Sequence, residues 1–146
     1  GIGFARYKNT AAYCAVIACV EVDELVRLTH VWAAVDTGEV INPDGVVNQI
    51  EGGIIQSSSW ALKEAVGFEG DTVSTLDWSS YPILKFSEIP EISVNLIDRP
   101  NDTPLGCAEA TQGPTVAAIG NAVRNALGVP VRDLPLTRDT IVSAIT

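Results

Sequence analysis

One acidic side chain in a loop of small residues is the sharpest chemical signal in the sequence. Residues 105–114 read LGCAEATQGP, and Glu109 is the one charged residue among them. A carboxylate at this place would feel the positive end of the dipole of the helix that Pro114 is expected to open. In an apolar enclosure, a carboxyl group holds its proton more tightly and can act as a general base near neutral pH. The alternative is a glutamate that only caps the helix.

A second candidate region combines side-chain amides with a pair of glycines. Residues 48–56 read NQIEGGIIQ, and helical spacing places four of them on roughly one side of a helix, namely Gln49, Gly52, Gly53 and Gln56. Two glycines inside a helix cost about 2 kcal/mol relative to alanine, so they need a reason. One reason is the close approach of a flat polar ligand. The other is the packing of a second helix against the glycines, with the amides in solvent.

The remaining nucleophiles and potential metal ligands give no further site. Cys14 and Cys19 fall on opposite faces of one expected strand, about 16 Å apart along it, so they cannot share a metal ion. We expect both to be small buried hydrophobic residues. His30 is the only histidine, which excludes mechanisms that need two, and its expected role is structural. The serines at 57–59 lie within an expected helix and lack the strand-to-helix turn of a serine nucleophile.

The elements that position these residues follow from the hydrophobic pattern. Residues 11–23 and 25–35 are rich in β-branched and small residues, and they predict a hairpin that turns at Asp23-Glu24. The run VWAAV at 31–35 is apolar at every position, which is typical of a strand covered on both faces. Asn42-Pro43 starts a helix that we expect over residues 43–66.

The second half of the chain predicts shorter elements. The alternation of ISVNLID predicts a strand over residues 92–98. Residues 99–113 form a loop that is long for a connection without structure, and such loops are usually functional. Short strands are expected at three further places, residues 71–77, 81–86 and 129–132.

Two more helices are expected near the end of the chain. Pro114 begins the first and Gly128 ends it, and its apolar stripe is Val116, Ile119, Ala122, Val123 and Ala126. Thr137 caps a short C-terminal helix that starts at about Arg138. The order of elements predicts an α+β (mixed α/β) fold in which an antiparallel-rich sheet carries two main helices and this short one.

Length and composition limit the class of protein. The chain has 146 residues, of which 47% are hydrophobic, which is enough for a single domain over 1–146 with its own core. With 9 basic and 18 acidic residues, its net charge of −9 argues against binding to nucleic acid or to an anionic membrane. The sequence contains no methionine, not even at position 1. We therefore expect a fragment of a longer polypeptide, with part of any site outside it.

Taken together, the motifs resemble the C-terminal part of the molybdopterin-binding large subunit of the xanthine dehydrogenase/aldehyde oxidase family, the molybdenum hydroxylases. The resemblance covers essentially the whole chain, through ARYKNT at 5–10, AAVDTG at 33–38, INPDG at 41–45, NQIEGG at 48–53, SYPI at 80–83 and the segment 106–114 with the helix that follows. Two departures concern the loop. Ala108 stands where the family usually has glycine, and the proline that often follows the glutamate comes only at Pro114.

The resemblance implies an oxidoreductase that hydroxylates an aldehyde or an N-heterocycle with a metal-bound hydroxide. Glu109 aligns with the family's catalytic glutamate, which takes the proton of that hydroxide. Gln49 aligns with a glutamine that contacts the pterin, and the other residues expected to line the cofactor are Gly52, Gly53, Gly106, Cys107 and Ala108. The cofactor would be molybdopterin with molybdenum, or its cytosine dinucleotide form, in the full-length enzyme. No residue of this chain is expected to bind the metal.

The resemblance also implies partners. The upstream part of the same large subunit would complete the cofactor site, an iron–sulfur subunit or domain would take the electrons, and the substrate would be a small molecule. The fragment alone is expected to be inactive. It is also expected to self-associate through an apolar patch near residues 43–66 or 105–114, which the upstream part would otherwise cover. Neither cytoplasm nor periplasm is favoured.

Two rival functions remain beside the enzyme. One is a non-catalytic interaction or dimerisation module, and the other is a stand-alone hydrolase that uses Glu109. The hydrolase is disfavoured because the sequence shows neither a metal-binding set nor a second acid for it. Glu109 discriminates between the other two, since a position in a polar cleft beside Gln49 favours the enzyme, whereas a helix cap in solvent favours the module.

Overall fold

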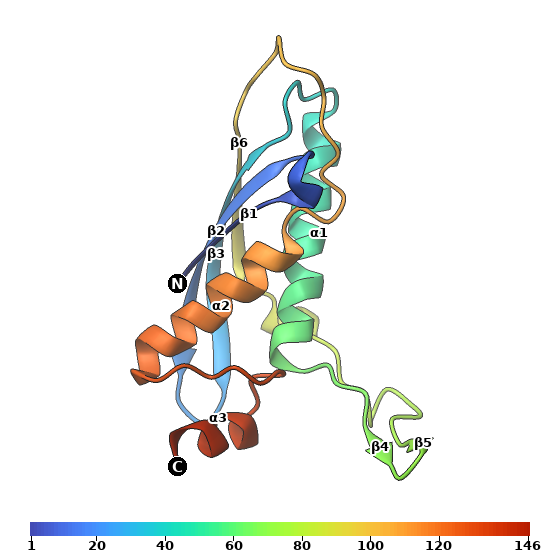
Figure 1. The fold of residues 1–146 in the computed structure, drawn as a ribbon, viewed down its shortest axis with the longest axis vertical. Coiled ribbons are helices and arrows are strands. Elements are labelled where there is room, and N and C mark those ends of the chain that lie inside the picture. Colours follow the sequence, from blue (N-terminus) through green and yellow to red (C-terminus); the bar gives the residue numbers. More distant parts are fainter.

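The computed structural model describes residues 1–146 and places two helices on one face of a four-stranded sheet (Figure 1). The strands lie in the order β1 (Ile2–Arg6), β2 (Tyr13–Val22), β3 (Val26–Asp36) and β6 (Glu91–Leu96). β2 pairs antiparallel with β1 and with β3, whereas β6 runs parallel to β3. The expected hairpin, the strand near 92–98 and the antiparallel-rich α+β fold are thus confirmed.

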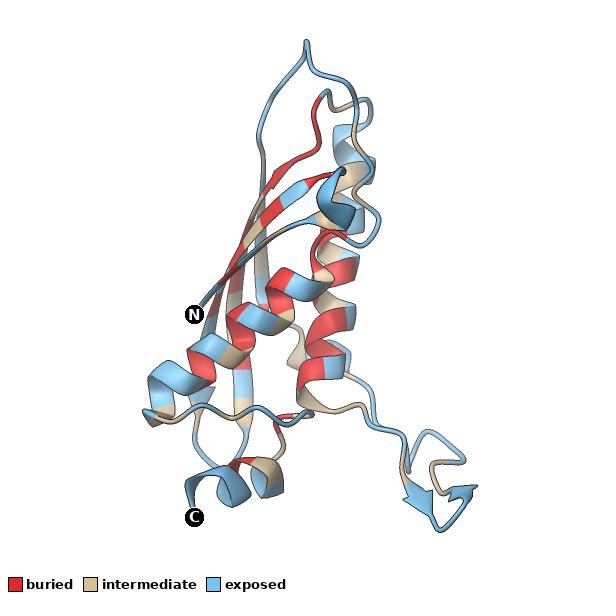
Figure 2. Ribbon diagram, in the orientation of Figure 1, coloured by how far each residue is buried: buried red, intermediate tan, exposed pale blue.

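The core lies between this sheet and helices α1 (Pro43–Leu62) and α2 (Gln112–Leu127). Alternate residues of the two central strands point to the helices, and they are fully or almost fully buried, as with Val16 and Val31. Ile54 of α1 and Ile119 of α2 meet them from the other side. Figure 2 shows the buried residues on the inner sides of both helices. The loop that carries Glu109 leads directly into α2. The packing of α2 on the sheet therefore holds the end of this loop in a fixed position.

The helix boundaries follow from capping groups. The Asn42 side chain accepts a hydrogen bond from the Gly45 N–H at the start of α1, and Gly128, with φ 77°, ends α2 as expected. The last helix, α3 (Arg138–Ile145), is capped by Thr137, again as expected. The helix expected over 43–66 ends four residues early, at Leu62, because the chain leaves the core there and residues 65 and 66 are exposed.

The start and the apolar stripe of α2 also differ from expectation. The helix begins at Gln112, two residues before Pro114, which is compatible with a proline in the first turn. Ile119, Ala122 and Val123 are buried as expected, whereas Ala126 is exposed and the neighbouring Leu127 packs against the core instead.

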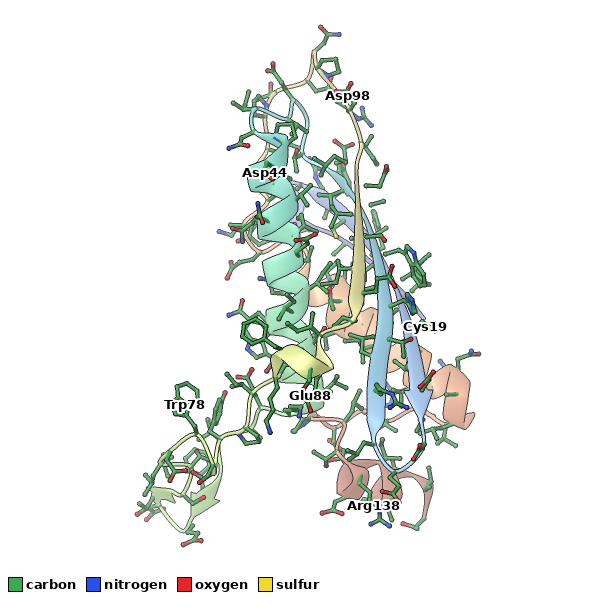
Figure 3. All side chains as sticks on the ribbon, turned by 180° about the vertical axis from the view of Figure 1, so that it is seen from behind. Cys19, Asp44, Trp78, Glu88, Asp98 and Arg138 are labelled. Atoms are coloured by element: carbon green, nitrogen blue, oxygen red, sulfur yellow. The ribbon has the colours of Figure 1, made fainter.

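One strand was not predicted from the sequence, and others that were predicted are absent or shorter in the structure. β1 was not expected at all, and the segments 81–86 and 129–132 form no strand. The strand expected at 71–77 is reduced to β5 (Thr72–Val73), which pairs only with β4 (Phe68–Glu69) in a hairpin that projects from the body (Figure 1). Apolar residues of this region are exposed, Trp78 among them (Figure 3). They have no neighbouring strand to pair with, so their apolar character alone does not produce a sheet.

The second face of the sheet carries no helix. Ile2, Phe4, Ile17 and Trp32 lie on it, and Trp32 is 44% exposed. The expectation that residues 31–35 are covered on both faces is therefore wrong for this chain. Exposed large apolar residues also lie in or beside the range 43–66, at Ile41, Trp60 and Val66, whereas residues 105–114 hold none, so the open sheet face is a further apolar surface. Self-association through such a surface stays a prediction. None of the helices combines the length and apolarity that a membrane span requires.

Candidate active site

The loop that carries Glu109 is fastened to three separate parts of the chain. The Leu105 N–H donates to the carbonyl oxygen of Thr37, which follows β3, at 2.8 Å. The Ala12 N–H donates to the carbonyl oxygen of Gly106 at 3.2 Å, and the Gln49 side-chain Nε2 donates to that of Ala108 at 2.7 Å. The two regions singled out in the sequence, around Gln49 and around Glu109, are therefore in direct contact although 59 residues separate the bonded pair.

Glu109 does not cap the helix that follows it. Thr111 is the N-cap residue of α2 and makes no side-chain capping bond, and no N–H of the first turn donates to Glu109. The carboxylate instead accepts a hydrogen bond at Oε2 from the hydroxyl of Tyr7, at 2.6 Å. The other carboxylate oxygen, Oε1, has no partner in the chain, and the residue is exposed. The helix-cap interpretation of Glu109 is thus wrong, and its carboxylate is held with one oxygen free.

An open hollow of about 380 Å³ lies beside this loop, at the N-terminal end of α1. Gln49, Cys107 and Ala108 line it together with Thr37, whose buried hydroxyl has no hydrogen-bond partner. Glu109 is not among the lining residues, but its neighbour Ala108 is. The hollow therefore brings together three of the six expected cofactor-lining positions, Gln49, Cys107 and Ala108, and the last of these directly precedes Glu109.

The two adjacent glycines in the middle of α1, Gly52 and Gly53, have different surroundings. Gly53 is buried, and a Cβ at this position would overlap the Thr111 hydroxyl, so the close packing of α1 on the start of α2 requires this glycine. Gly52 is exposed, with nothing within 4 Å of the place of a Cβ, and Gly106 is equally open. The packing alternative therefore accounts for Gly53. Contact of these glycines with a cofactor stays a prediction.

The three cysteines are free, and each has a different environment. Burial raises the pKa of Cys14 to about 12, so this thiol stays protonated and is the small hydrophobic residue that was expected. Burial also raises the pKa of Cys107, which therefore lines the hollow as a neutral thiol. Cys19 is exposed on the open face of the sheet (Figure 3), which contradicts its expected burial. As expected, Cys14 and Cys19 lie on opposite faces of β2.

His30 and the serines at 57–59 have structural surroundings. The His30 ring stacks on Trp32 with centroids 5.5 Å apart, and its Nε2 lies 3.1 Å from Glu91 on β6. Ser57 and Ser58 are buried in α1 and donate to carbonyl oxygens of the preceding turn. None of these groups reaches the hollow. No three His, Cys, Asp or Glu side chains converge in a way that could hold a metal ion.

Two features of the site were missed by the sequence reasoning. Tyr7 lies within the ARYKNT motif, yet nothing in its local sequence indicates that it reaches a residue 102 positions away. Asp36 and Arg99 form an ion pair at 2.9 Å, and Arg99 also contacts Asp102 at 3.2 Å, which ties the loop after β6 to the end of β3. The motif itself was the only available signal for Tyr7, and the Pro- and Gly-rich loop was the only one for Arg99.

The family model of the molybdopterin cofactor-binding domain matches residues 3–90, which is more than half of the chain. The matched range includes Tyr7, Gln49 and the glycine pair at 52–53, and it ends before Glu109. A nicotinate dehydrogenase chain of Pseudomonas putida is 40% identical over an alignment that covers 99% of this chain and 13% of that protein. A chain of the isoquinoline 1-oxidoreductase of Brevundimonas diminuta is 34% identical, with 93% of this chain and 17% of that protein covered.

A solved structure shows the same fold. Quinoline 2-oxidoreductase from Pseudomonas putida 86 matches with a TM-score of 0.83 and 29% sequence identity, over 92% of this chain and 18% of that one. The chain thus spans less than a fifth of the length of each of these three relatives.

Proposed function

Because this chain belongs to the molybdopterin cofactor-binding family of the molybdenum hydroxylases, we propose that it forms one wall of the cofactor site of a larger oxidoreductase and supplies its general base, Glu109. Residues 1–146 would be a single domain at the C-terminal end of the large subunit. The short share of each relative that the chain covers supports only the first part of this proposal, that the chain belongs to a larger enzyme. The rest of that subunit and an iron–sulfur subunit or domain would complete the enzyme.

The contact between Gln49 and the Glu109 loop carries this proposal. It joins the candidate cofactor ligand to the carbonyl oxygen of Ala108, the residue before the candidate base, at 2.7 Å, and both bonded residues line an open hollow. If the motifs around Gln49 and Glu109 had unrelated roles at the protein surface, the fold would not need to bring them into contact.

The residues of the hollow fit a flat, polar pterin. Gln49 uses one N–H for Ala108, so its amide oxygen and second N–H remain available to a ligand. The unpartnered hydroxyl of Thr37 is typical of a wall that an additional group completes, because buried polar atoms are almost always hydrogen-bonded. Since no side-chain cluster of this chain can hold a metal, molybdenum would be carried by the pterin. Gly52, Gly106, Cys107 and Ala108 would line the same cofactor, in plain or cytosine dinucleotide form, with Gly53 behind them.

When bound, the molybdenum cofactor supplies the redox chemistry and takes up the electron pair that the substrate carbon loses. Glu109 would accept a proton, at its unpaired Oε1, from the water-derived oxygen nucleophile that adds to that carbon. Gln49 would keep the loop in place through Ala108 while its free amide atoms bind the pterin. The backbone bonds from Ala12 and Leu105 would prevent the loop from moving away from the reacting atoms.

The substrate we propose is an aldehyde or a nitrogen heterocycle, and the names of the relatives favour the heterocycle. Nicotinate, isoquinoline and quinoline in these names are all nitrogen heteroaromatic compounds. An electron-poor ring carbon next to nitrogen is open to attack by an oxygen nucleophile once a base removes the nucleophile's proton.

Isotope labelling of the assembled enzyme that contains this chain tests the reaction class. We expect turnover of nicotinate or isoquinoline in H2¹⁸O to give a hydroxylated product that contains ¹⁸O, because the oxygen derives from water. Benzaldehyde serves as the aldehyde probe under the same conditions. Incorporation of label from ¹⁸O2 instead, or no turnover of any of the three compounds by enzyme with full molybdenum content, would contradict the proposed function.

A further inference from the structure

Tyr7 holds the carboxylate of Glu109 from a part of the chain far away in sequence. Its hydroxyl donates to Oε2 at 2.6 Å, within the range of about 2.5–2.7 Å that is usual for a hydrogen bond from a hydroxyl to a carboxylate. We infer that Tyr7 is a positioning residue for the general base, an inference that rests on the proposed role of Glu109. It would fix one carboxylate oxygen so that the other faces the proton to be removed.

The backbone around Tyr7 is built to keep the phenol in place. Tyr7 opens a short 3-10 turn, in which Lys8 and Asn9 both have positive φ angles, 50° and 60°. Residues other than glycine rarely adopt this conformation, and it persists only where the surroundings enforce it. The Tyr7 N–H donates to the Ala12 carbonyl at 2.8 Å, which closes the turn between β1 and β2.

The turn between β1 and β2 is also hydrogen-bonded to the loop that carries Glu109. The Ala12 N–H donates to the Gly106 carbonyl at 3.2 Å, so a backbone bond and the Tyr7–Glu109 bond join the two segments in parallel. The Tyr7 ring is only partly exposed and packs against the core. The donor and the acceptor are therefore each attached to rigid structure and to one another.

The hydrogen bond from Tyr7 restricts the orientation of a carboxylate that would otherwise rotate freely in solvent. Glu109 has three rotatable side-chain bonds and no other hydrogen-bond partner in the chain. Without Tyr7, its carboxylate would sample several orientations, and a misplacement of about 1 Å in a reacting group can cost about 10²-fold in rate. A single bond to Oε2 restricts rotation and leaves Oε1 free. A second donor on Oε1 would compete with the proton transfer, and the structure has none.

The chain offers a matched control. Tyr81 also donates its hydroxyl to a glutamate, Glu64, at 2.8 Å, but in the segment after α1, which does not touch the Glu109 loop. Tyr7→Phe and Tyr81→Phe therefore remove the same atom and the same kind of bond at two places. The variants are made in the assembled, molybdenum-loaded enzyme, and nicotinate is the substrate probe.

We expect Tyr7→Phe to lower kcat by about 10- to 100-fold with KM changed less than about twofold, because Tyr7 contacts the base and not the substrate. Molybdenum content per chain should equal that of the parent enzyme, and a crystal structure of the variant should show the Glu109 carboxylate rotated or in several conformers. Tyr81→Phe should leave kcat, KM and the Glu109 conformer unchanged. A Tyr7→Phe variant that keeps the parent kcat and a single Glu109 conformer would overturn the inference, as would a loss confined to KM.

Glu109→Gln, measured in parallel, separates this inference from the proposed function. If Glu109→Gln keeps the parent turnover per molybdenum, the general-base role is wrong and Tyr7 has no base to position. If Glu109→Gln loses turnover whereas Tyr7→Phe behaves like Tyr81→Phe, only the positioning role of Tyr7 is wrong.

Discussion

Gln49 of α1 donates a 2.7 Å hydrogen bond to the carbonyl oxygen of Ala108, the residue directly before Glu109. The contact joins one turn of a well-packed helix to a loop that contains no regular structure before α2. A change at position 49 therefore acts in two ways, on the proposed pterin contact and on the path of the loop.

Gln49→Ala should lower molybdenum occupancy more than turnover per bound molybdenum. One lost hydrogen bond is worth about 1 kcal/mol, which corresponds to about fivefold weaker retention of the cofactor. Metal analysis and turnover measured on the same preparation separate the two quantities. Asn125→Ala is the control, because Asn125 is an exposed amide on α2 that makes no side-chain hydrogen bond and does not line the hollow. Full occupancy in Gln49→Ala would show that Gln49 is not a cofactor ligand.

Alanine at Gly52 and alanine at Gly53, adjacent in α1, should have opposite effects on stability. In Gly53→Ala the new Cβ overlaps the Thr111 hydroxyl, and overpacking of this kind typically costs about 1–3 kcal/mol. In Gly52→Ala the Cβ enters open space, and better helix propensity should add about 1 kcal/mol. Urea unfolding of the two variants and the parent measures both effects. Equal stabilities would mean that α1 does not pack against Thr111 as described.

The ion pair between Lys63 and Glu88 should make stability depend on pH in the acid range. Burial acts to raise the pKa of Glu88, but the hydrogen bond from Lys63, at 2.6 Å, and the Lys85 N–H outweigh it and lower the pKa below its usual value of 4.5. Figure 3 shows Glu88 on the short turn beside the end of α1. Because the folded state holds the carboxylate ionised, the pair stabilises the fold above about pH 4.5, and this contribution is lost as the pH falls through the lowered folded-state pKa.

Glu88→Gln removes the charge and keeps the size of the side chain. The variant should melt below the parent at pH 7, and the difference should vanish as the pH falls below the usual carboxyl range. Glu69→Gln is the control, since Glu69 is exposed in the projecting hairpin and forms no ion pair. Melting curves between pH 7 and pH 3 test this expectation. A constant difference between Glu88→Gln and the parent at all pH values would refute it.

Local sequence signals predicted the parts of the fold that local chemistry determines. Asn42, Thr137 and Gly128 act at helix ends through their own side chain or backbone, and each was identified correctly. β1 could not be found in this way, because its Gly3 lies against the Pro114 carbonyl, with no room for a Cβ, and this need for glycine comes from α2. The segment 81–86 has the apolar character of a strand but finds no partner strand, which the sequence alone does not show.

The residues of the candidate site also fall into two groups, those that local sequence motifs predict and those that depend on contacts between distant segments. Gln49 and Glu109 were found from their motifs, and their contact through Ala108 follows from the packing of α1 beside the loop. The hydrogen bond from Tyr7 to Glu109 spans 102 residues and depends on the strained turn between β1 and β2, so no local pattern predicts it. For Gly53 the sequence left ligand approach and helix packing open, and the packing against Thr111 at the start of the neighbouring helix accounts for this glycine.

The central claim is that Glu109 supplies the base of a molybdenum-dependent hydroxylation, and turnover per bound molybdenum in Glu109→Gln tests it most directly. Glutamine keeps the size of the side chain and can still accept the Tyr7 hydrogen bond, but it cannot take a proton at neutral pH. A general base typically contributes about 10²–10⁴-fold, so turnover per molybdenum should fall by at least about 10²-fold while molybdenum content stays near that of the parent, with Glu69→Gln unchanged in both. Parent-like turnover per molybdenum in Glu109→Gln would contradict the account.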